Sequence, residues 1–277
     1  MPTQITGAVN RELRSAGYVA GGLAATTTVK TAGFPTGTRN LYLSCHNLSS
    51  ATVVEYTLNP WLTVLKTTDS GATFTDYSVE AQNDSADADI TLSSLDTVAN
   101  GEALFIGATV PFRGLQFDLE DLNDTASVLT ISYYNGTTWA DTSNSDGTDV
   151  GGDTLKQDGA NTWTINSAWV SEQFRNIMAK DNEPFKPTYV QPAGAREHVS
   201  SLYWVRLEVS AALDSSTTAN SIHALNRSER YAQLVLNQNH NQALKTGFGG
   251  FGSLEYSTDA GTADLVANVG SGDGYFG

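Results

Sequence analysis

The sequence predicts an all-β protein: an antiparallel β-sandwich or jelly-roll-like core with an extended N-terminal arm and a Gly-rich C-terminal extension. Three observations lead to this fold class. Short apolar runs alternate with polar residues, and clusters of turn residues separate the runs. Charged residues make up only 16% of the 277 residues, so the polar surface consists mainly of Ser, Thr, Asn, Asp, Gln and Gly. These residues favour strands and turns over helices.

The clearest alternation occurs in two runs, residues 112–119 and 202–209. A β-strand points successive side chains to opposite faces, so Leu115, Phe117 and Leu119 share one face. The second run has an apolar face formed by Tyr203, Val205, Leu207 and Val209. Its other face carries Trp204 with Arg206 and Glu208. Alternating strands, unlike continuous apolar strands, are typical of antiparallel sheets.

Further strands and one hairpin complete the predicted sandwich. The strand candidates are 41–45, 61–66, 73–79, 90–92, 103–107, 128–134, 162–165 and 219–225. Asn135-Gly136 follows one of these runs and precedes a Thr-Thr-Trp sequence, which is a strong hairpin signal. One or two helical turns are expected within 170–178. No βαβ period and no solenoid repeat occurs.

The sequence suggests three regions along the chain. Residues 1–40 mix scattered apolar residues with Gly and Thr and are expected to form an arm that packs on its own domain or on a neighbour. Residues 41–225 contain the predicted sandwich. Residues 226–277 include two aromatic and Gly-rich stretches and are expected to form an extension, or a small β subdomain, that orders on a partner.

Charge and cysteine content exclude several functions. Acidic residues number 30 and basic residues 15, which gives a net charge of −15 and disfavours binding to nucleic acid or to an anionic membrane. Cys45 is the only cysteine, so no intrachain disulfide and no thiolate zinc site can form, and we expect it to be buried in a strand. The first residues do not resemble a secretion signal, and no apolar stretch approaches the length of a transmembrane helix.

Two patterns resemble ligand sites. Gly247, Gly249 and Gly252 match dinucleotide-binding spacing, but a strand-like sequence follows where that site needs a helix. The loop 141–149 resembles a calcium loop at Asn144, Asp146, Gly147 and Asp153, although Thr142 stands where the first carboxylate belongs. We favour a solvated loop there, and a cation at this loop or at Asp84, Asp87 and Asp89 remains an alternative. The predicted cofactor and metal sites are therefore none.

No catalytic constellation stands out. The four histidines are His46, His198, His223 and His240. None has metal-binding spacing, and no Gly-x-Ser-x-Gly elbow occurs. We expect His223 to be packed within a strand. No pair of carboxylates is singled out for sugar hydrolysis, so the prediction is a protein without enzymatic activity.

Aromatic residues leave carbohydrate binding open as an alternative. A sugar-stacking platform could be built from Trp61, Trp139, Trp163, Trp169 and Trp204 together with Tyr133 and Tyr134. Aromatic residues more often pack in cores, and we expect at least three of these tryptophans to do so.

A resemblance appears in three blocks, 110–119, 126–139 with Asp146-Gly147-Thr148, and 202–209. These blocks resemble β-sandwich proteins that recur among the structural proteins of tailed bacteriophages. The likeness covers roughly residues 60–225 and transfers no catalytic residue. The arm and the Gly-rich extension lie outside it.

The resemblance implies a structural role in the virion. The leading expectation is a capsid decoration or cement protein that contacts the major capsid protein or other virion proteins and bridges neighbours through its terminal segments. It implies a homo-oligomer, with a trimer favoured. A tail, baseplate or fibre component is the first alternative, and a carbohydrate-binding adhesion module is the second.

Overall fold

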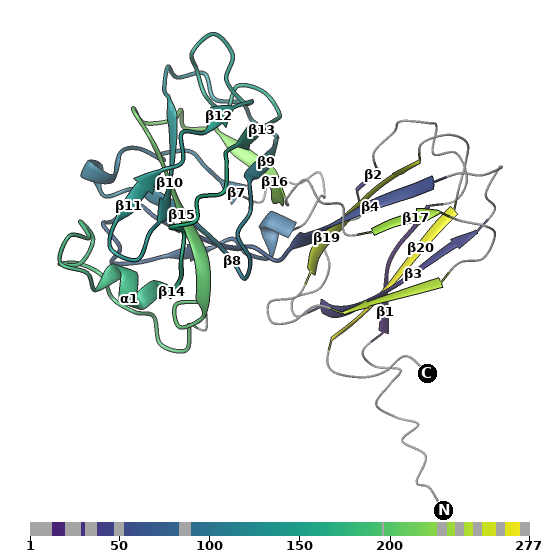
Figure 1. The fold of residues 1–277 in the computed structure, drawn as a ribbon. Helices are drawn as coiled ribbons and strands as arrows, with labels where there is room; N and C mark the ends of the chain where they lie inside the picture. Colours follow the sequence, from purple (N-terminus) through teal and green to yellow (C-terminus); the bar gives the residue numbers. More distant parts are fainter. Residues whose placement is uncertain are drawn as a thin grey trace, which may run out of the picture. The chain divides into compact units, whose positions relative to one another are not determined.

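The computed structural model divides the chain into two compact units (Figure 1). Unit 1 combines residues 1–61 with 228–277, and unit 2 comprises 62–227. The structure describes residues 13–19, 29–30, 38–46, 53–82, 90–195, 197–225, 232–235, 241–245, 251–258 and 264–271. Unit 2 is thus inserted between the two halves of unit 1.

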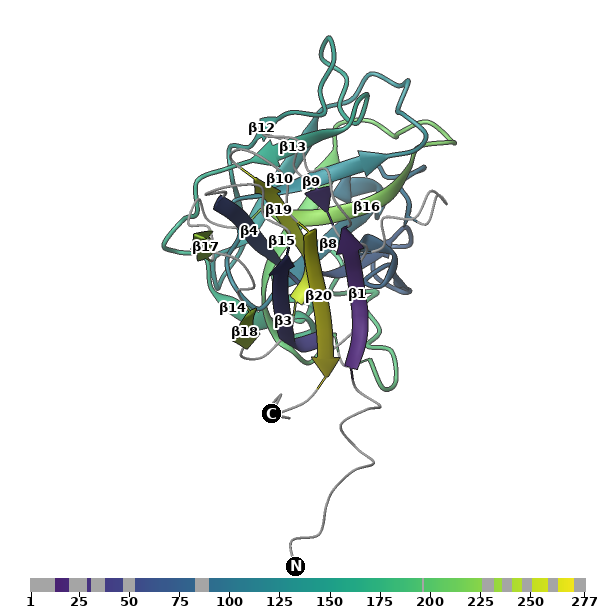
Figure 2. The ribbon, with the colours of Figure 1, turned by 90° about the vertical axis from the view of Figure 1, so that its right-hand side faces the viewer.

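Unit 1 contains two four-stranded antiparallel sheets. The first has the order β1-β20-β3-β18, and Figure 2 shows β1, β20 and β3 side by side. Its strands are β1 (Leu13–Val19), β3 (Thr38–His46), β18 (Asn241–Lys245) and β20 (Asp264–Ser271). The second has the order β17-β4-β19-β2. Its strands are β2 (Val29–Lys30), β4 (Val53–Pro60), β17 (Ala232–Val235) and β19 (Phe251–Thr258).

The observed division differs from the predicted one at the termini. The predicted boundary at residue 225 lies close to the end of unit 2 at Arg227. Strands β1 and β2 fall within the predicted arm, and β17 to β20 fall within the predicted extension, yet all six belong to unit 1 with β3 and β4. The described strands of the two terminal regions therefore form one unit together.

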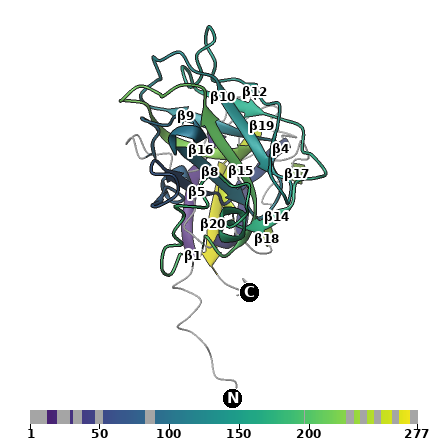
Figure 3. The ribbon, with the colours of Figure 1, turned by 90° about the vertical axis from the view of Figure 1, so that its left-hand side faces the viewer.

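Unit 2 also consists of two antiparallel sheets. The larger has the order β11-β10-β15-β8-β5-β6, with β14 also pairing with β15, and Figure 3 shows β10, β15, β8 and β5 in this succession. Its strands are β5 (Thr63–Thr67), β6 (Thr75–Asp76), β8 (Ala103–Ala108), β10 (Leu129–Tyr134), β11 (Trp139–Asp141), β14 (Ser171–Gln173) and β15 (Ser201–Val209). The smaller has the order β12-β13-β9-β16-β7. Its strands are β7 (Ile90–Thr91), β9 (Gly114–Leu119), β12 (Ser145–Asp146), β13 (Gly159–Thr162) and β16 (Thr218–Leu225).

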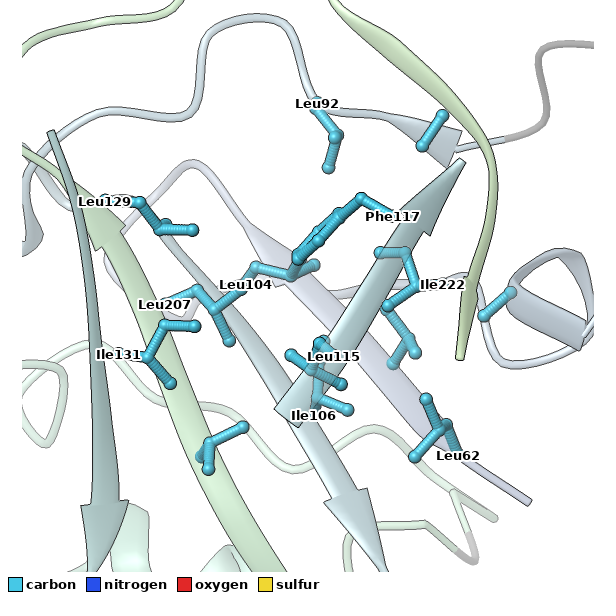
Figure 4. Close-up of a cluster of buried hydrophobic side chains, with 14 of the residues drawn as sticks. Leu62, Leu92, Leu104, Ile106, Leu115, Phe117, Leu129, Ile131, Leu207 and Ile222 are labelled. Carbon is cyan, nitrogen blue, oxygen red and sulfur yellow. The ribbon is translucent and has the colours of Figure 1, made fainter. Parts of the chain in front are cut away.

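The main core of unit 2 lies between these two sheets. Alternate residues of each strand point inward, as the sequence pattern predicts: Leu115 and Phe117 on β9 meet Ile106 on β8 and Leu207 on β15 (Figure 4). Each of these side chains is at most 1% exposed. Burying an aliphatic or phenyl side chain contributes about 1.5–3 kcal/mol, so this core is a main source of the stability of unit 2.

A second core covers the other face of the larger sheet. The segment 174–198, which begins with the short helix α1 (Phe174–Met178), packs against this face. The buried residues of the second core are Leu65, Ala103, Phe105, Tyr134, Phe174, Ile177, Met178, Phe185, Leu202 and Trp204. The larger sheet is therefore buried on both faces, and we call residues 174–198 the covering segment.

The predicted antiparallel β-sandwich is confirmed, as are the predicted helical turn within 170–178 and the hairpin at Asn135-Gly136. The hairpin loop has four residues, 135–138, because β10 and β11 pair only as far as Tyr134 and Trp139. Gly136 adopts a φ of 96°, and the Asn135 carboxamide oxygen accepts from the backbone N–H groups of Thr137 and Thr138. The predicted strand 73–79 is wrong in extent, since only Thr75–Asp76 pairs. Among the described residues, no helix is long and apolar enough to span a membrane.

Candidate functional site

The tryptophans of unit 2 do not form a sugar-stacking platform. Trp163, Trp169 and Trp204 are at most 8% exposed, which confirms the expectation that at least three tryptophans lie in the core. Tyr133 and Tyr134 are buried as well. Trp169 packs edge-on against Phe112, and its indole N–H donates to the carbonyl oxygen of Trp204. These aromatic faces are used for packing.

Trp139 belongs instead to a partly buried charged cluster under the covering segment. Its indole N–H donates to Glu183 Oε2 at 2.7 Å, and the Arg206 guanidinium lies over its ring at 5.2 Å. Burial raises the pKa of Glu183, against the hydrogen bond from Trp139 and the attraction of Arg206. Burial also lowers the pKa of Arg206, against the attraction of Glu208 and Glu183. The cluster anchors the covering segment to strands β11 and β15.

Ser221 and His223 form the pair of described residues closest to a nucleophile and base. They lie on β16, and Ser221 Oγ is 3.0 Å from His223 Nε2. Asp118 on β9 stands opposite Ser221 in the ladder, whereas Gln116 stands opposite His223. Nucleophilic catalysis of this kind needs a nucleophile that a substrate can reach. Ser221 and His223 are at most 1% exposed, so this geometry suits packing, as the sequence predicts for His223.

His198 is buried at the end of the covering segment, where it is 1% exposed. Its Nδ1 atom shares a hydrogen bond with the Tyr189 hydroxyl at 2.8 Å, and its ring contacts those of Phe74 and Phe174. Burial lowers the pKa of His198 to about 4, against the attraction of Asp76. Neutral His198 therefore helps hold the covering segment on the sheet.

We expect His198 to make the protein less stable in acid. Between pH 6.5 and about 4 the unfolded chain binds a proton at this residue, whereas the folded chain does not. The contribution of neutral His198 to the free energy of unfolding is fully present above pH 6.5. It falls as the pH approaches 4, by roughly 3 kcal/mol at 1.36 kcal/mol per pKa unit. Urea unfolding of the wild type and of His198→Phe at pH 7, 5.5 and 4 measures this effect. Equal slopes with pH in both proteins would show that the imidazole is not responsible.

The loops at one end of unit 2 are joined to each other by buried polar side chains. We call residues 92–95, 120–128, 147–158 and 210–217 the loop end. The ladders place the loops 120–128 and 210–217 together. Leu119 and Ala219, which pair, border one side of these two loops, and Leu129 and Val209, which also pair, border the other side. The first and last residues of unit 2 lie on the side of the sandwich opposite the loop end, where Leu225 pairs with Gly114.

Asn123 is the main connection within the loop end and is fully buried. Its Nδ2 atom donates to the carbonyl oxygens of Thr125 and Thr154, at 2.7 and 2.9 Å. Its Oδ1 atom accepts from the backbone N–H groups of Thr125 and Asp214, at 3.0 and 3.3 Å. One carboxamide thus links the loops 120–128, 147–158 and 210–217, which fixes their mutual positions.

Asp214 adds a second connection. Its Oδ2 atom accepts from Asp124 N at 2.6 Å, and its Oδ1 atom accepts from the backbone N–H groups of Ser216 and Thr217. Partial burial favours a higher pKa for this carboxyl group, but the hydrogen bonds from Asp124, Ser216 and Thr217 outweigh it and lower the pKa to about 2. The ionised carboxylate is therefore part of the folded loop end.

We expect Asp214→Asn to cost about 1 kcal/mol at neutral pH, because the amide replaces one acceptor oxygen by a donor, while solvent around this partly exposed carboxylate screens part of the loss. The stabilisation by wild-type Asp214 is present above its ordinary pKa near 4 and is lost as the pH falls towards 2. The difference between the two proteins in urea unfolding should accordingly shrink from pH 6 to pH 2.5. Asp121→Asn, at an exposed carboxyl of the same end, is the matched control. A difference that stays constant with pH would contradict this role.

The loop end also exposes large aliphatic side chains. Leu122, Val128 and Val150 are 44%, 58% and 44% exposed. Leu122 precedes Asn123, whose backbone N–H donates to Leu155 O. Val128 follows Ser127, whose carbonyl oxygen accepts from Thr154 N, and Val150 N donates to Asp153 O. Exposed apolar side chains on fixed loops are suited to contact with another protein surface.

The remaining predicted sites lie partly within and partly outside the described residues. The side-chain oxygens of Asp146 accept from Thr148 and Thr154 within the chain, so this carboxylate of the calcium-like loop serves the loop itself. Among the described residues no group of three or more His, Cys, Asp or Glu is placed to hold a metal ion. Gly252 lies in strand β19, and Gly247 and Gly249 lie outside the described residues. The acidic stretch at residues 84–89 and His240 also lie outside them, and Cys45 and His46 lie in β3.

Comparison of the chain with protein families, with curated proteins and with solved structures gives no match.

Proposed function

We propose that this chain is a structural protein of a tailed-phage virion and that it binds the capsid as a decoration protein. The resemblance over residues 60–225 and the antiparallel sandwich support this proposal. The loop end carries it: Asn123 and Asp214 hold three loops together, and two of these loops present exposed aliphatic side chains, Leu122 and Val128 on one and Val150 on the other.

The chemistry of the loop end suits contact with another virion protein. Loops that are already fixed lose little conformational freedom on binding, so a modest apolar contact can give useful affinity. Glu120, Asp121 and Asp124 are exposed beside Leu122 and favour a partner surface with basic residues through electrostatic complementarity. The proposed partner is the major capsid protein, and several copies of this chain would strengthen binding by acting together.

Pelleting with emptied, undecorated capsids tests this function. We expect the chain to co-pellet at a fixed stoichiometry. Replacement of Leu122, Val128 and Val150 by Ser should weaken binding about tenfold or more, which corresponds to about 1.4 kcal/mol. Val79→Ser, at a valine that is 61% exposed outside the loop end, is the matched control and should bind normally.

The outcomes separate the alternatives. A chain that never pellets with capsids excludes capsid decoration and favours a tail, baseplate or fibre role. A triple variant that binds as tightly as the wild type excludes the loop end as the contact surface.

A further inference from the structure

The sequence contains two Asn-Gly pairs, Asn100-Gly101 and Asn135-Gly136, and the fold places them in different surroundings. An Asn-Gly pair is prone to a reaction within the backbone, because glycine has no side chain to hinder the approach of its nitrogen to the preceding carboxamide. Both glycines have a positive φ, 88° for Gly101 and 96° for Gly136. The two pairs can therefore be compared directly within one chain.

Three donors hold the side-chain oxygen of Asn135. Oδ1 accepts from the backbone N–H groups of Thr137 and Thr138, at 3.0 and 2.9 Å, and from the Thr137 hydroxyl at 2.9 Å. An asparagine side chain that accepts from the N–H two residues on folds back over the peptide bond that follows it. The side-chain carbonyl carbon of Asn135 is thereby brought over its bond to Gly136.

These donors are placed where negative charge would develop. Attack of the Gly136 nitrogen on the side-chain carbon of Asn135 turns Oδ1 into an oxyanion. Backbone N–H groups and hydroxyls that already point at such an oxygen stabilise its charge without reorganising. The Gly136 N–H makes no hydrogen bond with another described residue, so its nitrogen is not engaged elsewhere in this part of the chain. The hairpin loop thus supplies an oxyanion hole for its own asparagine.

Asn100-Gly101 is arranged differently. The Gly101 N–H donates to the carbonyl oxygen of Val98 at 3.0 Å, so the attacking nitrogen is held in the helical turn that precedes it. The Asn100 carboxamide donates through Nδ2 to Asp96 Oδ2 at 2.6 Å. A carboxylate beside the carboxamide opposes the formation of a second negative charge. The fold therefore disfavours at this pair the reaction that it favours in the hairpin.

We propose that Asn135 and Gly136 form a self-modification site, at which the folded chain converts Asn135 into aspartate and isoaspartate. The Gly136 nitrogen loses its proton to water or hydroxide and forms a bond to the side-chain carbon of Asn135. The bond from this carbon to Nδ2 breaks, and the nitrogen leaves as ammonia with a proton from water. Water then opens the cyclic imide at either carbonyl group, which gives the two acids. No oxidant or reductant takes part.

The modification would act on the attachment of the covering segment. Asn182 Nδ2 of that segment donates to the carbonyl oxygen of Thr137 at 3.0 Å, and the Tyr134 hydroxyl donates to that of Gly136 at 2.9 Å. Isoaspartate adds a carbon atom to the backbone of this loop and would displace both acceptors. The site lies outside the loop end, so this inference goes beyond capsid binding and does not depend on it.

Peptide mapping of the full-length chain by mass spectrometry tests this site. The folded protein would be incubated at pH 8, and the conversion of amide to acid and the content of isoaspartate would be followed at both pairs. We expect Asn135 to react about tenfold or more faster than Asn100, because fixed oxyanion donors change rates by at least this factor. The chain unfolded in urea is the control, since both pairs then lose their folded surroundings and should react at similar rates.

Equal rates at the two pairs of the folded chain, or faster conversion of Asn100, would overturn the proposal. It would equally fail if Asn135 stays intact in the folded chain over the time in which the unfolded chain is converted. These comparisons need no variant and no capsid, so their outcome is independent of capsid binding.

One substitution tests the oxyanion hole itself. Thr137→Val removes the hydroxyl donor and keeps both backbone donors, so it should slow the reaction of Asn135 severalfold and leave that of Asn100 unchanged. Thr138→Val, at a residue that contacts Asn135 through its backbone, is the matched control and should react like the wild type. An unchanged rate in Thr137→Val would show that this hydroxyl does not stabilise the oxyanion. If the variant does not fold, the comparison of the two pairs in the wild type decides.

Discussion

Deletion of residues 228–277 is expected to abolish unit 1 as a folded unit and to leave unit 2 folded. The deletion removes β17 to β20, which supply every described partner of β1 to β4. Strands β1 to β4 would then lose all the strand partners that the described residues show for them. Limited proteolysis followed by mass spectrometry should show rapid cleavage within residues 1–61 and protection of residues 62–227.

Deletion of only residues 272–277, which follow β20, is the matched control and should leave the protease resistance of residues 13–60 unchanged. A truncated chain in which residues 1–61 stay protected would show that β1 to β4 pair among themselves, contrary to the observed ladders. Unit 2 should unfold in urea at the same midpoint in both truncated proteins, because all its described strands remain.

Trp204→Ala is expected to lower the free energy of unfolding of unit 2 by about 3–5 kcal/mol, the usual cost of removing a large buried aromatic side chain. Trp204 has no exposed surface, and its ring centroid lies 4.8 Å from that of Phe174. Its indole N–H also donates to the Glu172 carbonyl oxygen at 3.0 Å. The substitution therefore removes the centre of the second core and one hydrogen bond to β14, the strand that leads into the covering segment.

Urea unfolding followed by circular dichroism measures this loss. Val190→Ala, at a valine of the covering segment that is 60% exposed, should change the stability by less than about 0.5 kcal/mol. Similar losses in the two variants would mean that the covering segment contributes little packing energy. Hydrogen exchange should show that Trp204→Ala increases exchange most strongly within residues 174–198.

Local sequence patterns predicted the sandwich of unit 2 because its strands alternate. Leu115 and Phe117 face the main core, as do Val205 and Leu207, and the period of two is sufficient to identify that face. Asn135-Gly136 identified the hairpin because few sequences allow such a tight reversal. These features depend only on residues that are close in sequence.

Which strands join to form unit 1 could not be predicted in this way. Leu13 pairs with Gly270, and Cys45 pairs with Leu265, so the pairing partners are separated by most of the chain. The hydrophobic period of a strand indicates which face is buried and carries no information about which strand lies beside it. The composition of residues 226–277 predicted an extension or a small β subdomain and gave no indication that its four strands pair with β1 to β4.

The buried charges were also missed. Arg206 lies on the face of β15 that the pattern marks as polar, yet its side chain is only 12% exposed and attracts Glu183 of the covering segment. Glu183 on the covering segment is 5% exposed and contacts Trp139. Pro184, Pro187 and Pro192 restrict the backbone of the covering segment, but a sequence does not show which surface such a segment covers.

The pairing of β1 to β4 with β17 to β20 in unit 1 also has a consequence for synthesis of the protein. A ribosome that adds roughly 5–20 residues per second takes about 10–40 s to proceed from Trp61 to the C-terminus. During this time β1 to β4 have emerged while the complementary strands do not yet exist, and unit 2 can fold meanwhile. Unit 2 can therefore fold while the chain is still being made, whereas unit 1 can be completed only after β20 has left the ribosome.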